Sequence, residues 1–207
     1  MTFRTGDAPT AVTSETRRAG KVRRLCIYAV RGFLALLLLC GIWMGVQQLI
    51  GNFHTVVAGQ LYRAARFDAS EIAGFQKDYG IRTIINLRGA DSSDWYKQQI
   101  AQSEALGIAH LDFRLSASKE LTQSQVEALI AMMRDAPKPI LVHCTGGADR
   151  SGIAAALYLG AIAKAGEYAA EWQLSPFYGH IPLPFAPAWA MDETWERIEP
   201  WLGFPNS

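Results

Sequence analysis

Cysteine is scarce in this chain. Only three cysteines are present, and two of them, Cys26 and Cys40, lie in or beside a long apolar segment. The third, Cys144, is the only cysteine after that segment, so it has no disulfide partner in that part of the sequence. This scarcity excludes a small disulfide scaffold and a cysteine-ligated zinc site. A lone thiol also suits an oxidising compartment, where a second thiol would invite a disulfide.

An excess of charge of one sign is also missing from the chain as a whole. The 20 Lys and Arg residues against 19 Asp and Glu give no general attraction to nucleic acid, so no nucleic-acid partner is expected. No internal repeat is visible, and 207 residues suffice for one domain with a proper core. The basic residues are unevenly placed, because the first 31 positions hold seven of them against two acidic ones.

A long apolar segment follows this basic end. Gly32 to Val46 would span about 22 Å as a helix, and extension to Ile50 gives about 28 Å, against roughly 30 Å for a bilayer core. We predict a membrane anchor over residues 25–50. The alternative is a signal sequence, but "VQQLIGNFH" lacks the spaced pair of small residues that a cleavage site needs. Residues 1–24, rich in Thr, Ser, Gly and Arg, are predicted to form a disordered tail.

The basic flank also predicts an orientation. Positive residues beside a membrane segment stay in the cytoplasm. The N-terminus would then be cytoplasmic, and residues 51–207 would lie on the far side, which is the periplasm in a bacterium. The expected arrangement is a single-pass protein of the bacterial inner membrane.

Strand-like and helix-like segments alternate after residue 51. The strand-like segments are "QLYRA", "IRTIINLR", "IAHLDFRL" and "ILVHC". The helix-like ones open with capping-box spacings, Asp68 with Glu71 and Thr122 with Gln125, and Gly80 is a stop signal. This alternation predicts an α/β fold with a mainly parallel central sheet flanked by helices.

The sequence "HCTGGADRSG", residues 143–152, lies between the last strand and a helix. Its glycines let the backbone curl with several N–H groups facing inward, and the helix N-terminus adds its positive end. Arg150 adds a planar clamp for phosphate oxygens. Cys144 lies at the base, where the same field stabilises a thiolate nucleophile. The residues predicted to line this phosphate cradle are Thr145, Gly146, Gly147, Ala148 and Arg150.

Other interpretations of this stretch explain less of it. A buried cysteine at a strand end is commonly part of the core, but that does not account for two glycines and an arginine in register after it. A nucleotide-binding P-loop would need Gly-Lys-Ser/Thr, which is missing. A sulfur-transfer loop would not require the arginine.

The stretch resembles the His-Cys-x5-Arg-Ser/Thr-Gly signature of the cysteine-dependent protein tyrosine and dual-specificity phosphatases. "GQLYRAARF", "GIRTIINLRG" and "YGH" are similar to segments of bacterial members, so the resemblance covers about residues 59–195. It implies a phosphocysteine on Cys144, with Arg150 binding phosphate and Ser151 assisting departure of the thiolate. It also implies that His143 orders the loop and that no metal or cofactor takes part.

The general acid departs from the family pattern. Many such phosphatases carry an Asp on an upstream loop, whereas the matching region "RLSASKEL" has none. Asp149 is one candidate, because myotubularin-type lipid phosphatases have Asp at that position; Asp112 and Glu120 are the others. Asp149 could instead cap the helix. Arg88 follows the "IINL" strand and is expected to hold the loop by an ion pair or to help bind substrate.

The sequence therefore predicts a phosphomonoester hydrolase of the tyrosine or dual-specificity type. The substrate could be a phosphorylated protein, a lipid or a small molecule. An inositol headgroup is less favoured, because the loop carries Thr145, Gly147 and Ala148 where phosphoinositide phosphatases often carry lysines. The alternatives are a lipid or envelope-component phosphatase of the same mechanism and a phosphate-binding pseudophosphatase without turnover.

Overall fold

The computed structural model describes residues 12–204, which fall into two units that meet between Ile42 and Trp43. The first unit belongs to helix α1, Val12–Leu49. Within α1, Ala19–Leu49 is long and apolar enough to cross a membrane, and an 18-residue window of it has a mean hydropathy of 2.3. A helix of that length spans about 46 Å, more than a bilayer core.

The beginning of α1 differs from the predicted disordered tail. Residues 12–24 are helical, and residues 1–11 of that tail lie outside the described residues. From Val12 onward this stretch has no proline and contains good helix formers, among them Ala19, Lys21 and several arginines. A helix already nucleated in the apolar segment extends through such residues without a new nucleus.

The second unit is built on a five-stranded sheet in the order β1-β2-β5-β3-β4. The strands are β1 His54–Val57, β2 Leu61–Ala64, β3 Thr83–Asn86, β4 Ala109–Asp112 and β5 Ile140–His143. Only β1 is antiparallel to its neighbour, and the other pairs are parallel. The predicted mainly parallel sheet is therefore confirmed, whereas β1 was not predicted.

Helices and short helical turns connect these strands. They are η1 Ala69–Glu71, α2 Ile72–Tyr79, α3 Asp94–Ala105, α4 Gln123–Asp135, α5 Asp149–Leu157, the π-helical η2 Tyr158–Ala163, α6 Glu167–Glu171, η3 Trp172–Leu174, η4 Pro176–Tyr178, η5 Pro187–Trp189 and α7 Ala190–Leu202. The predicted signals act where expected: Thr122 Oγ1 accepts from the Gln125 N–H at the start of α4, and Gly80 ends α2 with a φ of 69°.

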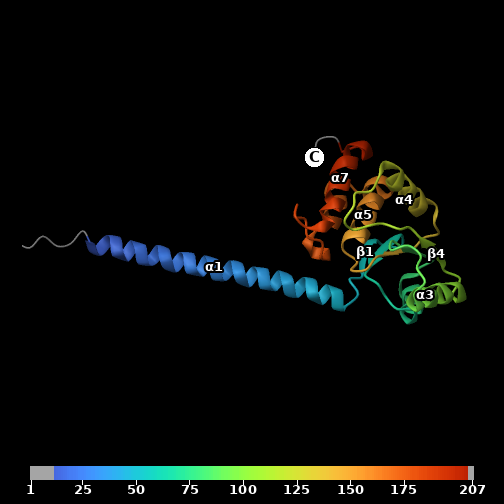
Figure 1. The fold of residues 1–207 in the computed structure, drawn as a ribbon, viewed down its shortest axis with the longest axis horizontal. Helices are drawn as coiled ribbons and strands as arrows, with labels where there is room; N and C mark the ends of the chain where they lie inside the picture. Colours follow the sequence, from blue (N-terminus) through green and yellow to red (C-terminus); the bar gives the residue numbers. More distant parts are fainter. Residues whose placement is uncertain (1–11, 205–207) are drawn as a thin grey trace, which may run out of the picture. The chain divides into compact units, whose positions relative to one another are not determined.

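The sheet has a hydrophobic core on each face. In β5, Ile140 and Val142 pack into the core that includes side chains of α4, α5 and α7, whereas Leu141 packs with residues of α2 on the other face. Figure 1 shows α4, α5 and α7 together on one side of the sheet and α3 on the other. Because β2, β5 and β3 are parallel, their carboxyl ends meet at one edge, and Cys144 follows β5 there.

Candidate active site

Cys144 leaves the end of β5 and is buried, with 2% of its surface exposed. Its Sγ accepts a hydrogen bond from the Gly147 N–H at 3.2 Å. Helix α5 begins at Asp149, five residues after Cys144. The chain between strand and helix thus curls over the sulfur atom.

The first two carbonyl groups of this loop point away from the sulfur, toward neighbouring segments. The carbonyl of Thr145 accepts from the backbone N–H of Arg66 at 3.1 Å. The carbonyl of Gly146 accepts from the side-chain amides of Gln48 at 2.9 Å and Asn52 at 2.8 Å. Sequence patterns gave no signal for Gln48 and Asn52, because they lie almost a hundred residues before the loop.

Arg63 of β2 binds the next two carbonyls. Its Nη2 donates to the carbonyls of Gly147 at 2.8 Å and Ala148 at 2.7 Å, and its Nη1 donates to that of Gln173 at 2.8 Å. The guanidinium lies 4.3 Å from the ring centre of Tyr178 and is fully buried. Burial lowers the pKa of Arg63 to about 10, so it remains a cation at neutral pH. Sequence analysis missed Arg63, and the one available signal is an arginine inside an otherwise apolar strand.

The direction of these carbonyls fixes the direction of the amides. In a planar trans peptide the N–H points opposite to the preceding C=O. The amides of residues 146–149 therefore face the inside of the loop, above the sulfur. Gly147 makes the curl possible, because its φ is 68° and a Cβ there would lie 2.5 Å from the backbone nitrogen of Ala65. An inward ring of amides is an anion-binding geometry.

Arg150 lies at the rim of this ring. Its Nη2 donates to Thr145 Oγ1 at 2.9 Å, and its Nη1 is 3.5 Å from the carbonyl of Leu115. Ser151, in the first turn of α5, is buried and its hydroxyl donates to the carbonyl of Ala64 at 3.4 Å. Arg150 is thus beside the amides, and Ser151 lies beneath the loop.

His143 and Arg88 take positions that the sequence did not predict in detail. His143 is fully buried against Phe67, and its ring nitrogens have no hydrogen-bond partner among the described residues. Burial is the main cause that lowers the pKa of His143 to about 3, so the ring is neutral.

Arg88 pairs with Asp91 at 3.9 Å and lies over the ring of Trp95. One expectation for Arg88 was an ion pair that holds the signature loop. The ion pair in the structure instead joins Arg88 to a residue three positions further along the chain.

Asp149 forms a hydrogen-bonded chain with His180 and Asp192. His180 is fully buried, and its two ring nitrogens lie 2.8 Å from carboxylate oxygens of Asp149 and Asp192. Burial lowers the pKa of His180, but the two hydrogen bonds and the carboxylate charges outweigh it and raise the pKa to about 9. Asp149 is the first residue of α5, after Ala148 as N-cap, and its carboxylate contacts His180.

The other two candidate acids are engaged elsewhere. Asp112, at the end of β4, accepts hydrogen bonds from the Asn86 amide and the Tyr96 hydroxyl. Glu120 is half exposed and forms an ion pair with Arg197 at 3.2 Å. Of the three carboxylates, Asp149 is the one within the signature loop and helix.

The buried imidazolium of His180 predicts a pH-dependent stability. Its pKa is higher in the folded protein than the ordinary 6.5, so protonation favours the folded state. This contribution, up to about 3 kcal/mol, is complete below pH 6.5 and is lost as the pH rises through 9. Denaturant unfolding of the detergent-solubilised chain should show the loss in the wild type and a much flatter profile in His180→Gln. Parallel profiles for the two proteins would contradict this assignment.

Arg63 predicts a second effect on stability and anion binding. Lysine keeps the charge at this position, but one ammonium cannot reach both loop carbonyls and Gln173. Unpaired buried carbonyls cost about 1–3 kcal/mol, so Arg63→Lys should lower the melting temperature by several degrees and weaken phosphate binding. Arg66→Lys is the matched control, because Arg66 contacts the loop through its backbone N–H. Equal melting temperatures for the two variants would refute this role of Arg63.

The chain has relatives among known protein families. Residues 52–180, more than half of the chain, match the family described as "Swiss Army Knife protein, DSP-PTPase phosphatase domain". No curated protein matches the chain. The matched range contains the signature loop, Arg63 and His180.

Several solved structures share the fold. P. aeruginosa TpbA is 20% identical, with a TM-score of 0.54 over 75% of this chain and 92% of TpbA. The catalytic core of the PP-IP phosphatase SIW14 from S. cerevisiae is 18% identical, with a TM-score of 0.54 over 75% of this chain and 93% of that core. PTPMT1 is 14% identical, with a TM-score of 0.51 over 73% of this chain and 98% of PTPMT1.

Proposed function

Because the chain belongs to the Swiss Army Knife family of DSP-PTPase phosphatase domains, we propose that it hydrolyses phosphomonoesters through a phosphocysteine on Cys144. The observation that carries the proposal is the outward direction of four successive loop carbonyls above a buried sulfur. The inward amides and Arg150 would hold the non-bridging phosphate oxygens, which leaves the phosphorus facing Sγ.

The proposed reaction has two steps. In the first, Cys144 Sγ bonds to phosphorus, the bond to the leaving oxygen breaks, and the proton shared by the His180 imidazolium and Asp149 passes through Asp149 to that oxygen. In the second, water attacks the phosphocysteine, Asp149 takes a proton from the water, and inorganic phosphate leaves as the thiolate re-forms. His180 fixes the carboxyl of Asp149 by a 2.8 Å hydrogen bond, and Ser151 assists the departing thiolate.

Phosphotyrosine of a protein is the first candidate substrate. TpbA, which shares the fold, has been crystallised as a cysteine-to-serine variant in complex with pTyr. The loop side chains of Thr145, Gly147 and Ala148 add no cation that would select a more highly charged group.

A phosphate of a lipid or envelope component is the second candidate. Gln48, which donates to the Gly146 carbonyl, belongs to the last turn of the apolar helix α1. Asn52, three residues after α1, donates to the same carbonyl. A phosphatase domain tethered to a membrane by α1 would encounter phosphates of membrane and envelope components.

Phosphate release from a substrate panel tests the proposed function. The full chain in detergent micelles would be given nitrophenyl phosphate, a phosphotyrosine peptide, a phosphoserine peptide and a lipid phosphomonoester. We expect turnover of the aryl phosphates, and preference for the lipid would favour the second candidate. Phosphate binding without turnover of any substrate would refute hydrolysis and indicate a pseudophosphatase.

We also propose that the chain is a single-pass protein of the bacterial inner membrane with its phosphatase domain in the periplasm. The supporting observations are the apolar span Ala19–Leu49 and the basic residues at its N-terminal side. The lone Cys144 of the phosphatase domain would find no disulfide partner there.

Reporter fusions test this topology. Alkaline phosphatase fused after residue 207 should be active, and a fluorescent protein that matures only in the cytoplasm should stay dark. Reporters fused to the N-terminus should give the opposite result. A bright fluorescent protein at the C-terminus would overturn the periplasmic placement.

A further inference from the structure

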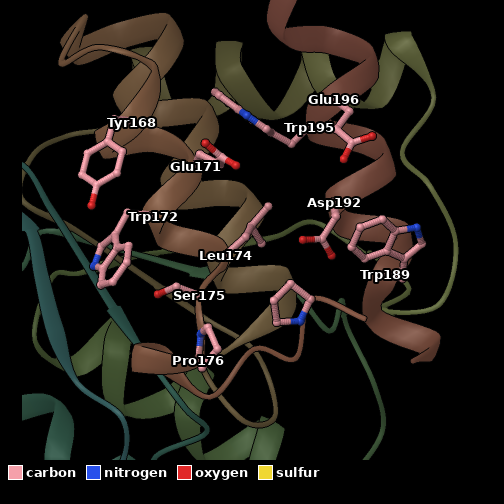
Figure 2. Close-up of a pocket in the computed structure, with 11 residues that line it drawn as sticks. Tyr168, Glu171, Trp172, Leu174, Ser175, Pro176, Trp189, Asp192, Trp195 and Glu196 are labelled. Carbon is pink, nitrogen blue, oxygen red and sulfur yellow. The ribbon is translucent and has the colours of Figure 1, made fainter. Parts of the chain in front are cut away.

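A cleft outside the signature loop separates α6 and η3 from α7. It consists of two cavities of about 360 and 370 Å³, both lined by Glu171, Trp195 and Glu196. Figure 2 shows the first cavity, with Tyr168, Glu171 and Trp172 on one side and Asp192, Trp189 and Glu196 on the other. Cavities of this size accommodate small organic ligands.

The cleft is acidic and lacks compensating cations. None of the described residues that line the two cavities is a lysine or arginine, and the carboxylates that line them are Glu167, Glu171, Asp192, Glu196 and Glu199. Within residues 12–204, Asp192 is the one member of this set in an ion pair, which it makes with His180. Several carboxylates that face one cleft concentrate negative electrostatic potential there, and this potential attracts a cation.

Buried acceptors in the cleft point to a ligand more strongly than surface charge does. Glu199 is 8% exposed, lines the second cavity and makes no ion pair within the described part of the chain, and its carboxylate oxygens keep some contact with solvent. Ser175 is 6% exposed, lines the first cavity, and its hydroxyl is buried without a partner among residues 12–204. Buried polar groups are normally satisfied, so these acceptors suit a ligand that brings donors.

The lining also indicates what kind of cation fits. Among the described residues, no three His, Cys, Asp or Glu side chains converge to hold a metal ion. Instead, aromatic rings line the first cavity beside Glu171: Trp172 is 46% exposed and stacks on Tyr168 with ring centres 6.1 Å apart. Exposed rings beside separated carboxylates suit a cation whose charges are joined by methylene groups.

We propose that this cleft binds a linear alkylammonium polycation, with its ammonium groups on Glu171, Glu196 and Glu199 and its methylenes on Trp172. Two kinds of molecule carry such ammonium groups: a free polyamine, and a polypeptide that presents its lysine side chains. Asp192 connects the cleft to the signature loop, because His180 bridges it to Asp149. The site is separate from the proposed hydrolysis and can be tested by binding alone.

Calorimetric titration of the full chain in detergent micelles tests the site, with spermidine as probe and a tri-lysine peptide as the second arm. The double variant Glu171→Gln/Glu196→Gln should weaken spermidine binding at least tenfold, and Trp172→Ala should weaken it severalfold. The matched control is Glu104→Gln/Glu127→Gln, which removes two exposed carboxylates from α3 and α4. Binding should also fall as salt rises.

The outcomes are distinct. Wild-type affinity in the control double and loss in the cleft double would support the site, and tighter binding of tri-lysine than of spermidine would identify a polypeptide as the source. Equal weakening in both doubles would overturn the proposal, since it would show attraction to net charge only. If magnesium binding depends on Glu171 and Glu196 as strongly as spermidine binding does, the cleft is a metal-ion site and the proposal is overturned. Neither result depends on phosphatase turnover.

Discussion

Replacement of Cys144 by serine should abolish turnover of every phosphomonoester while the domain stays folded. A serine hydroxyl is a far weaker nucleophile than a cysteine sulfur. Removal of an enzyme nucleophile acts on a scale of roughly 10⁴-fold or more. The measurement is phosphate release from nitrophenyl phosphate, with the melting temperature recorded in parallel.

Anion binding separates loss of the nucleophile from loss of the loop. Cys144→Ser should still bind inorganic phosphate, because the inward amides and Arg150 remain. Arg150→Lys retains the nucleophile but loses the planar fork, so it should bind phosphate more weakly and be slower by about a hundredfold. Wild-type turnover in Cys144→Ser would contradict the whole mechanism.

Replacement of Asp149 by asparagine should slow poor leaving groups far more than good ones. An alkoxide from phosphoserine or a lipid needs a proton, whereas an activated nitrophenolate hardly does. General acid catalysis is worth about 10² to 10⁴, and most of that loss should appear with the poor leaving group. The measurement is kcat/KM for a phosphoserine peptide and for nitrophenyl phosphate in wild type and variant.

The same comparison distinguishes the rival carboxylates. Asp112→Asn and Glu120→Gln should slow both substrates by similar, small factors, since Asn86 and Tyr96 hold Asp112 and Arg197 pairs with Glu120. If Asp149→Asn slows both substrates equally and lowers the melting temperature, Asp149 has a structural role through His180. A leaving-group effect in Asp112→Asn would assign the acid to Asp112.

The local part of the site could be predicted from sequence. Short-range sequence patterns predict a buried strand, a loop with Cys144 and two glycines, and a helix that follows. The structure has β5, the loop and α5 in that order. The parallel sheet was predictable for the same reason, because alternating strand and helix signals need no long-range information. Strand β1 was not, since "HTVV" is short and pairs only at the sheet edge.

The support of the loop could not be predicted, because its partners are distant in sequence. Arg63 lies 84 residues before Gly147, and Gln48 lies 98 residues before Gly146. No pattern in the sequence links an arginine in a strand, or an amide at a helix end, to carbonyls so far along the chain. His180 is similar: it lies 31 residues after Asp149, and the buried chain of carboxylates appears only when α5 and α7 pack together.

Direct detection of a phosphocysteine on Cys144 tests the central claim. Ser151→Ala should slow the hydrolysis step, so that rapid mixing with nitrophenyl phosphate and acid quench traps the intermediate. Mass spectrometry of the digested chain should then find one phosphoryl group on the peptide that contains Cys144, together with a burst of one nitrophenolate per active site. Phosphate release without any burst, or a phosphoryl group on another residue, would contradict the account.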